Sequence, residues 1–328
     1  MDALTGLLDG PRARGAFLLR IVLDPPWAMR VEDEAPLSLV AVTRGAAWVA
    51  AEDGPARALG PGDVVVAPGP APYVLGDDPA TPTQVVVRPG PRCVTPQGQP
   101  LDEPLEQAGP GWRLRSHGYS GVRTWGNTAD GATELLVGTY LTRSAVGRRL
   151  TAALPELAVL PGFAADTGLF GLLGEEIVRD APGQDVVLDR LLDLLLVAAL
   201  RSWFSRPEAE APPWYRARDD PAIGPALRML IDDPARGWTV ATLAGAARMS
   251  RAAFAKRFTE LVGEPPMAFL AGWRLAMAAD LLRDTEATLG TVARTVGYGS
   301  PFALSTAFKR VHGVSPQEHR RAAQAAMS

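Results

Sequence analysis

The side chains that could carry out catalysis in this chain are few, and their spacing argues against most enzyme mechanisms. Three histidines (His117, His312 and His319) and a single cysteine (Cys93) occur among 328 residues. A catalytic metal needs three or four converging His, Asp, Glu or Cys ligands, and the last two histidines lie in a different part of the chain from His117. No serine lies in a Gly-x-Ser-x-Gly elbow, and no glycine-rich phosphate loop is present. The sequence predicts a protein that is not an enzyme and has no metal or cofactor.

The single cysteine also limits redox chemistry. One thiol excludes an internal disulfide, a four-cysteine zinc site and a Cys-x-x-Cys pair within the chain. We interpret Cys93 as an inert thiol, with oxidant sensing between two chains as the alternative.

Basic residues are distributed unevenly, which points to a different kind of chemistry. Between Arg236 and Arg321 the formal charge is +6, whereas the rest of the chain has a formal charge of −9. The chain has two lysines, Lys256 and Lys309, and both lie in the basic part. A basic segment joined to an acidic remainder is typical of a DNA-binding domain attached to a second domain.

Two helix-turn-helix patterns occur in this basic part. Residues 251–263 form an amphipathic pattern that places Phe254 and Phe258 on one face and Lys256 on the other, and Ser250 is suited to cap the helix. A shorter helical pattern at 239–249 precedes it. The same pattern returns 50 residues later, and one long amphipathic helix at 266–283 joins the two. Two such units can enter successive major grooves on one face of DNA, about 34 Å apart.

The region from 238 to 321 resembles the C-terminal domain of the AraC/XylS family of bacterial transcription regulators. The strings that carry the resemblance are LAGAARMSRAAFAKRFTELVG, WRLAMAADLL, VARTVGYGS and FKRVHGVSPQEHR. The resemblance implies binding to double-stranded operator or promoter DNA, with RNA polymerase as a further candidate partner. The expected DNA-contact residues are Ser250, Arg251, Ala252, Lys256, Arg257, Thr259, Ser300, Phe302, Thr306, Lys309 and Arg310.

The second unit departs from the family at two positions. Phe302 stands where a small or polar residue is usual, and Thr306 stands where an arginine is frequent. In one interpretation Phe302 contacts a thymine methyl group or a sugar. In the other, which the sequence favours, it folds back onto the connecting helix. The second unit would then bind DNA mainly through the phosphate backbone and leave base reading to the first.

The N-terminal half has the pattern of a β-sandwich or barrel. Short apolar runs at 17–23, 37–43, 46–51, 63–67, 84–88 and 134–140 are separated by glycine and proline. The string GDVVVAPGPAPYVLGD resembles the second cupin motif, with Gly62 and Pro68 in place, but Tyr73 stands where the metal-binding histidine would be and Asp77 where asparagine would be. The whole half resembles the sensor domain of a cupin-containing branch of the same regulator family.

A barrel of this kind can hold one small apolar or aromatic effector. The candidate effector-binding residues are Trp27, Arg44, Trp48, Tyr73 and Trp125, and simple core packing is the alternative for the aromatic ones. Trp48 and Tyr73 belong to strands that we expect to line the interior.

We therefore expect an α+β multidomain fold. Residues 1–204 form a cupin-like β-barrel with accessory helices, 205–218 a linker, and 219–328 an all-α domain with two helix-turn-helix units. The resemblance suggests that helices at 166–204 form a homodimer interface; packing within the domain is the alternative. The expected function is DNA-binding transcription regulation controlled by a small molecule, in the cytoplasm and without membrane contact. The alternatives are a cupin enzyme with a DNA-binding tail and a regulator whose barrel only dimerises.

Overall fold

The computed structural model describes residues 17–90, 92–101, 113–116, 123–128, 130–140, 145–163, 168–179, 181–206, 209 and 211–325. The chain divides into two compact units. The sheet unit comprises the described residues between 17 and 140 and between 154 and 209, and the helical unit comprises residues 145–153 and 211–325.

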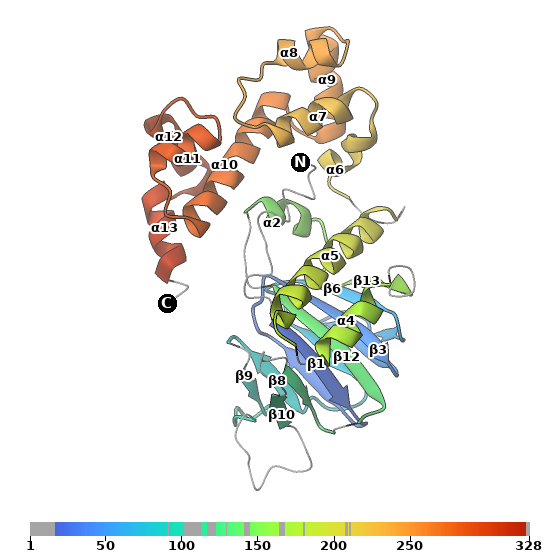
Figure 1. The fold of residues 1–328 in the computed structure, drawn as a ribbon. Helices are drawn as coiled ribbons and strands as arrows, with labels where there is room; N and C mark the ends of the chain where they lie inside the picture. The colour runs from blue at the N-terminus through green and yellow to red at the C-terminus, as the bar shows by residue number, and fades with distance from the viewer. Residues whose placement is uncertain are drawn as a thin grey trace. The chain divides into compact units, whose positions relative to one another are not determined.

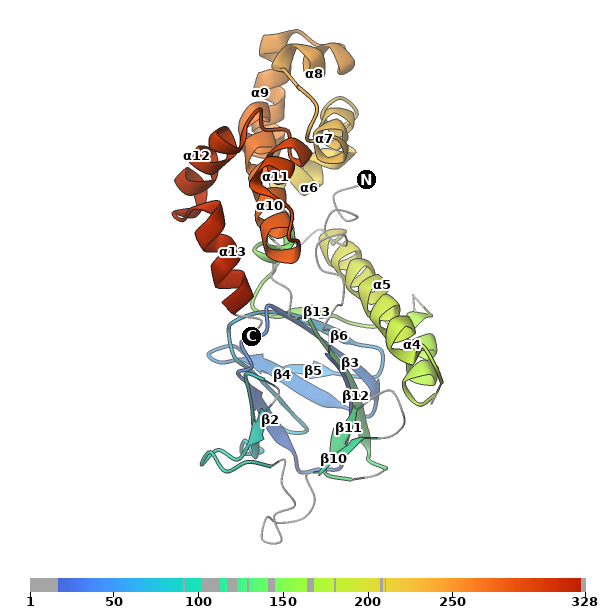
Figure 2. The same cartoon turned by 60° about the vertical axis from the view of Figure 1, so that its left-hand side comes forward.

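The sheet unit contains two sheets, as the sequence predicts (Figures 1 and 2). A seven-stranded sheet has the order β10-β11-β1-β12-β3-β6-β13, and a six-stranded sheet has the order β5-β4-β7-β2-β8-β9. The strands are β1 (Phe17–Leu23), β2 (Ala28–Val31), β3 (Leu37–Arg44), β4 (Ala47–Ala51), β5 (Arg57–Leu59), β6 (Val64–Pro68), β7 (Tyr73–Gly76), β8 (Val85–Arg88), β9 (Arg92–Val94), β10 (Arg113–Ser116), β11 (Arg123–Gly126), β12 (Thr133–Tyr140) and β13 (Ala158–Leu160).

Two helices, α4 (Leu169–Ile177) and α5 (Gln184–Phe204), lie on the outer face of the seven-stranded sheet (Figures 1 and 2). The hydroxyl of Tyr140 on β12 donates a hydrogen bond to the carbonyl of Leu192 on α5, at 2.7 Å. A Cβ atom at Gly138 would lie 2.7 Å from Leu192 Cδ2, so the glycine allows this close approach. Because its outer face is covered in this way, β3 is buried at nearly every position rather than at alternate ones.

The helical unit is organised around the long helix α10 (Pro266–Asp284), as the connecting pattern predicts. In Figures 1 and 2, α7, α8 and α9 gather toward one end of α10, and α11, α12 and α13 toward the other. The helices are α2 (Ala145–Thr151), α6 (Pro213–Arg216), the 3-10 turn η1 (Ala217–Asp219), α7 (Ile223–Asp232), α8 (Val240–Ala246), α9 (Arg251–Val262), α11 (Leu289–Thr295), α12 (Pro301–His312) and α13 (Pro316–Ala325).

Two segments belong to the helical unit although we assigned them elsewhere from the sequence. Helix α2 lies within the expected cupin region of the chain, yet it packs on α10. Helix α6 lies within the expected linker, where the rings of Trp214 and Trp273 meet edge to face with centroids 6.2 Å apart. The apolar pattern of a helix of seven or fewer residues does not indicate which distant helix packs against it. The sequence therefore did not predict the packing of α2 or of α6.

Candidate nucleic-acid interface

The helices α9 and α12 form a matched pair that shares two equivalent buried positions. Phe254 and Phe258 are fully buried in α9, and Leu304 and Phe308 occupy the equivalent buried positions of α12. Because residues in a helix advance by about 100° each, the opposite face of both helices is left exposed. This exposed face carries Ala252 and Lys256 in α9 and Phe302 and Thr306 in α12.

Three predicted contact residues use their hydroxyl groups inside the protein. Ser250 and Ser300 are the N-caps of α9 and α12, and their hydroxyl oxygens accept hydrogen bonds from the backbone N–H groups of Ala253 (3.2 Å) and Ala303 (3.1 Å). The hydroxyl of Thr259, which is half-buried, donates to the carbonyl of Ala255 at 2.8 Å. These residues therefore hold the helices in shape, and their side chains are less available to a ligand.

The cations of α9 have different environments. The side chain of Lys256 is 79% exposed and lies 3.9 Å from Glu260, a weak i,i+4 ion pair. Arg251 is exposed in the first turn. Arg257 is instead held by Asp220, with Nη2 and Oδ2 2.6 Å apart. Burial acts to raise the pKa of Asp220, but the Arg257 bond and two backbone N–H groups outweigh it and hold the pKa below its usual value.

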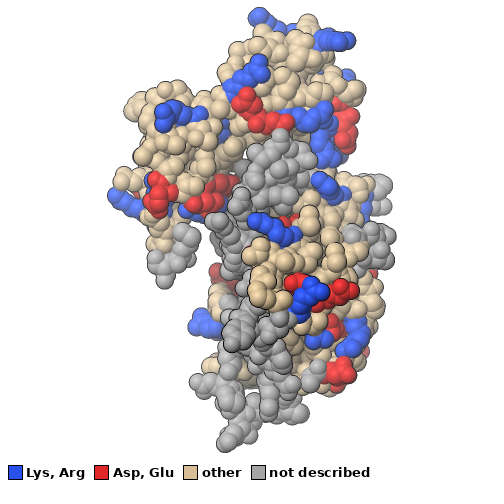
Figure 3. All heavy atoms as spheres, in the orientation of Figure 1, with Lys and Arg blue, Asp and Glu red and all other residues tan. Residues whose placement is uncertain are grey.

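The cations of α12 lie in its last turn, where Lys309 and Arg310 are exposed. On the face shown in Figure 3, Lys and Arg side chains appear over the α8–α9 end of the helical unit and over its α11–α12 end. Each candidate recognition helix therefore has exposed cations, in α9 from its first turn onward and in α12 in its last turn.

Phe302 does not fold back onto α10, which was the interpretation that the sequence favoured. Its side chain is 81% exposed. Phe302 lies in the first turn of α12, on the face opposite the buried Leu304 and Phe308. The departure from the family pattern is therefore a surface feature.

The closing motif GVSPQEHR fixes the last helix on α10. The backbone N–H of Ser315 donates to the carboxylate of Glu318 at 2.7 Å, and the Glu318 N–H donates to the Ser315 hydroxyl at 3.3 Å, which is a capping box. Arg320 donates to the carbonyl of Leu282, in the last turn of α10, and to that of Ala287, in the segment between α10 and α11. His319 packs edge to face on Phe308, with ring centroids 5.4 Å apart.

Sequence reasoning missed the contribution of α2 to this unit. The backbone N–H of Ala145 donates to the carboxylate of Asp280 on α10 at 2.7 Å. Arg149 pairs with Glu264 at 2.8 Å, and its guanidinium lies 5.1 Å from the centre of the Phe269 ring. The basic run of α2 was the one local signal, and it does not identify these partners.

In the sheet unit, the structure brings together three of the five predicted effector residues. Trp27, Tyr73 and Trp125 all belong to the buried apolar cluster of the unit. Trp48 does not: its strand neighbours Ala47 and Val49 are in the cluster, so Trp48 points to the other face of β4. Its indole there covers Gly76 of the paired strand.

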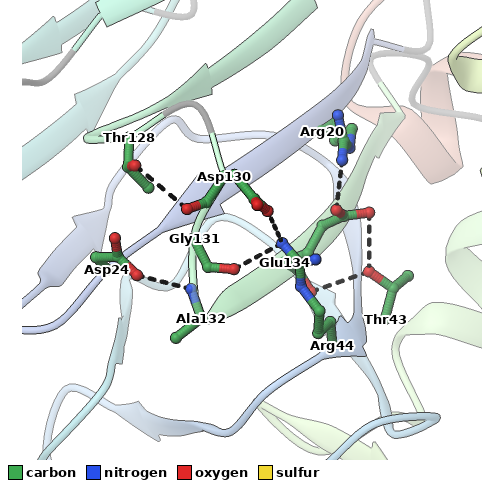
Figure 4. A network of polar contacts seen from close by, with 9 residues as sticks. All are labelled: Arg20, Asp24, Thr43, Arg44, Thr128, Asp130, Gly131, Ala132 and Glu134. Carbon is green, nitrogen blue, oxygen red and sulfur yellow. Dashed lines mark hydrogen bonds and ion pairs between the residues drawn. The ribbon is translucent and has the colours of Figure 1, made fainter.

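Arg44 is likewise away from this cluster. It lies at the end of β3, where it pairs with Asp130 at 3.0 Å and donates to the carbonyl of Gly131 at 2.6 Å (Figure 4). The same network contains Glu134, which accepts from Arg20 at 2.6 Å and from the Thr43 hydroxyl at 3.2 Å. Arg44 therefore stabilises a turn next to the strand pair β3–β12.

The residues of the cupin motif do not suit a metal. Tyr73 stands at the ligand position, and burial raises the pKa of its hydroxyl well above the usual value, so the phenolate that a metal would need is disfavoured. Within the described residues, no group of three or more His, Cys, Asp or Glu side chains is arranged to hold a metal ion. We derive no metal chemistry for this site.

Comparisons with known proteins agree with this geometry. Residues 2–205 match the family described as Cupin, and residues 243–322 match the family described as Helix-turn-helix domain. A protein of Streptomyces lividans named as an AraC-like transcription regulator is 30% identical over 98% of each chain. The chain belongs to the AraC family of transcription regulators.

Two further relatives span different parts of this AraC-family regulator. The HTH-type transcriptional regulator AlkR of Acinetobacter baylyi is 26% identical over 98% of this chain and 99% of its own. The DNA-binding domain of AdpA, solved in complex with a target DNA, is 32% identical, covers 32% of this chain and 95% of that one, and has a TM-score of 0.31. Among the described helices of this AraC-family regulator, none combines the length and apolarity needed to cross a membrane.

Proposed function

We propose that this regulator binds specific DNA sequences by placing α9 and α12 in two major grooves, and that a small molecule in its cupin barrel controls this binding. The observation that supports binding to DNA is that α9 and α12 form a matched pair of helices. Two capped helices with equivalent buried positions sit toward opposite ends of α10, and each exposes the first turn that recognition helices point at base edges.

The chemistry of α9 suits guanine and phosphate. Arg251 is exposed in the first turn and Lys256 in the middle of the helix, and such cations donate to guanine O6 and N7 or to phosphate oxygens. Arg257 acts mainly within the protein, because Asp220 holds it. In the barrel, Tyr73 occupies the position of the metal-binding histidine, so the proposal concerns binding of an effector there.

Support for a small-molecule effector comes from Trp27. Its side chain is fully buried in the apolar cluster, and its indole Nε1 has no hydrogen-bond partner within the described part of the chain. A buried donor without a partner costs about 1–3 kcal/mol. An apolar or aromatic molecule with one acceptor oxygen would recover that cost, so we propose this class of effector.

The test is binding of the full chain to a duplex that it has selected from a random-sequence pool, followed by fluorescence anisotropy. We expect tighter binding to the selected than to the scrambled duplex by about 10³ or more, with a steep salt dependence. Lys256→Ala should weaken binding about fivefold to tenfold and reduce the salt slope by about one, because one cation leaves the interface.

The matched control is Arg57→Ala, which removes an exposed cation from β5 in the sheet unit. It should leave both the affinity and the salt slope unchanged. Equal losses in the two variants would show that the effect of Lys256 is one of net charge. Equal binding to the selected and scrambled duplexes would contradict sequence-specific binding.

For the effector, Trp27→Phe should weaken the binding of an aromatic ligand with an acceptor oxygen, and isothermal titration calorimetry measures this change.

A further inference from the structure

We propose that α12 reads thymine through the side chain of Phe302, so that the two recognition helices select different base pairs. This proposal rests on the DNA-binding function proposed above. Phe302 is the most exposed of the large hydrophobic side chains that the structure describes, at 81%. It is the second residue of α12, directly after the N-cap Ser300 and Pro301. This is the part of a recognition helix that meets the base edges.

The first seven residues of α12, which include Phe302, lack the groups that read guanine. Residues 301–307 of α12 include no charged side chain, whereas residues 251–257 of α9 include Arg251, Lys256 and Arg257. Thr306 follows Phe302 after one turn, rotated by about 40° around the helix, and it is exposed too. The cations of α12, Lys309 and Arg310, come in its last turn, where they suit phosphates rather than bases.

The chemistry of this face matches one base. In the major groove, thymine alone of the four bases presents a methyl group, at C5, and side chains that contact it are apolar ones such as Phe and the methyl group of Thr. Arg251 and Lys256, the exposed cations of α9 that face outward, pair with guanine instead. Phe302 with Thr306 therefore favours a T·A pair in the half-site of α12, while α9 favours a guanine in its own half-site.

Uracil provides a direct test, because it differs from thymine by the absence of the 5-methyl group. Each thymine of the selected duplex is replaced in turn by uracil, and the affinity of the full chain is measured by anisotropy. For the wild type we expect an affinity loss of about fourfold at one or two adjacent positions, the effect of one buried methyl group. These positions should lie in one half-site.

Variants of Phe302 complete the double-mutant cycle. Phe302→Ala should bind the thymine duplex about tenfold more weakly and show no further loss with uracil. Phe302→Leu keeps an apolar contact and should retain part of the discrimination. The control is Val311→Ala, an exposed apolar residue of the same helix that lies about 180° away from Phe302. It should discriminate thymine from uracil as the wild type does.

The outcomes separate this proposal from the one on which it rests. If the wild type prefers the selected duplex but binds thymine and uracil equally at every position, the role of Phe302 is overturned and DNA binding stands. A uracil penalty that persists in Phe302→Ala also overturns it, since another residue then contacts the methyl group. If Phe302→Ala changes the oligomeric state of the protein without DNA and leaves the discrimination between thymine and uracil unchanged, the role in base reading is overturned and Phe302 belongs to a contact between two chains. Equal binding to selected and scrambled duplexes overturns both proposals.

Discussion

Single residues set the geometry of the two turns that precede the recognition helices. Arg248 and Gly297 occupy equivalent places, with φ of 53° and 82°. In both turns the next residue donates its N–H to a carbonyl five positions back, Met249 to Ala244 and Tyr298 to Ala293. A left-handed φ costs a non-glycine residue about 1–2 kcal/mol, so the first turn carries a strain that the second does not.

Substitutions at these two positions should therefore have opposite effects on the free energy of unfolding. Arg248→Gly should raise the free energy of unfolding by about 0.5–1 kcal/mol, since the strain is removed at the expense of some chain entropy. Gly297→Ala should lower it by more than about 2 kcal/mol, because the new Cβ would also lie 2.6 Å from Ala235 Cα. Denaturant unfolding followed by helical circular dichroism measures both. A loss of stability in Arg248→Gly would show that the arginine side chain contributes more than the strain costs.

The ion pair between Asp220 and Arg257 gives the helical unit a dependence on pH. Although burial raises the pKa of Asp220, its bond to Arg257 and the N–H groups of Ala222 and Ile223 keep the pKa below the usual value. The folded state then binds protons less readily than the unfolded state, so the stabilisation is present above about pH 4 and is lost as the pH falls below it.

Asp220→Asn tests this ion pair while keeping an oxygen for the two backbone N–H groups. At pH 7 we expect the melting temperature of the variant to be a few degrees below that of the wild type. The difference should shrink as the pH falls below about 4, because Asp220 of the wild type is then protonated first in the unfolded state and, at lower pH, in the folded state. Melting curves from pH 3 to pH 7 provide the measurement. A constant difference across this range would mean that the substitution disturbs packing and not charge.

At the scale of elements, α2 is unusual because it packs in the helical unit although strands of the sheet unit precede and follow it in the chain. It is part of the helical unit, but the chain leads into it from β12 and out of it to β13. Arg149 fixes α2 through its bond to Glu264 and its contact with Phe269.

Removing Arg149 should release α2 from α10. A half-buried ion pair with a cation–π contact is worth about 1–2 kcal/mol, so in Arg149→Ala the amide hydrogens of α2 should exchange about tenfold faster than in the wild type. Hydrogen exchange with mass spectrometry follows the peptide that spans Ala145–Thr151. Arg228→Ala removes the same charge from an exposed position of α7 in the same unit and serves as control. Equal protection in both variants and the wild type would contradict the anchoring role of Arg149.

These elements also show what the sequence can and cannot predict. The two helix-turn-helix units were predictable because their information is local: serine caps at 250 and 300 and equivalent apolar positions 50 residues apart. The docking of α2 was not, because its partners Glu264 and Asp280 lie more than a hundred residues away. For Trp48 the error was one of register, since neighbouring residues of a strand face opposite sides.

At the scale of the whole molecule, the outer surface of α4 and α5 suggests how two copies could assemble. Exposed large apolar side chains gather there and form what we call the α4–α5 patch: Leu172, Val178, Val186, Val187 and Leu194. Val187 and Leu194 lie seven residues apart and so share one face of α5. A two-fold dimer uses the same patch on both chains, and two copies of an apolar patch satisfy that requirement directly.

We therefore predict that the chain forms a homodimer through the α4–α5 patch. Leu194→Glu places a charge in the patch, and it should shift the protein from dimer to monomer in analytical ultracentrifugation at micromolar concentration. Ala58→Glu, which adds the same charge at an exposed position of β5, should remain dimeric. A mass that does not differ among the wild type and these two variants would exclude the patch as the dimer interface.

The dimer also predicts a difference between two kinds of DNA. On a duplex with two copies of the selected site, the second chain of a dimer binds at an effective concentration set by its connection to the first, which can raise the overall affinity by about 10²–10⁴. Leu194→Glu should lose this gain and yet bind a single-site duplex like the wild type, because α9 and α12 are unchanged. If the variant loses affinity for both duplexes equally, the substitution has damaged the fold. If it loses affinity for neither, the two chains act independently on DNA.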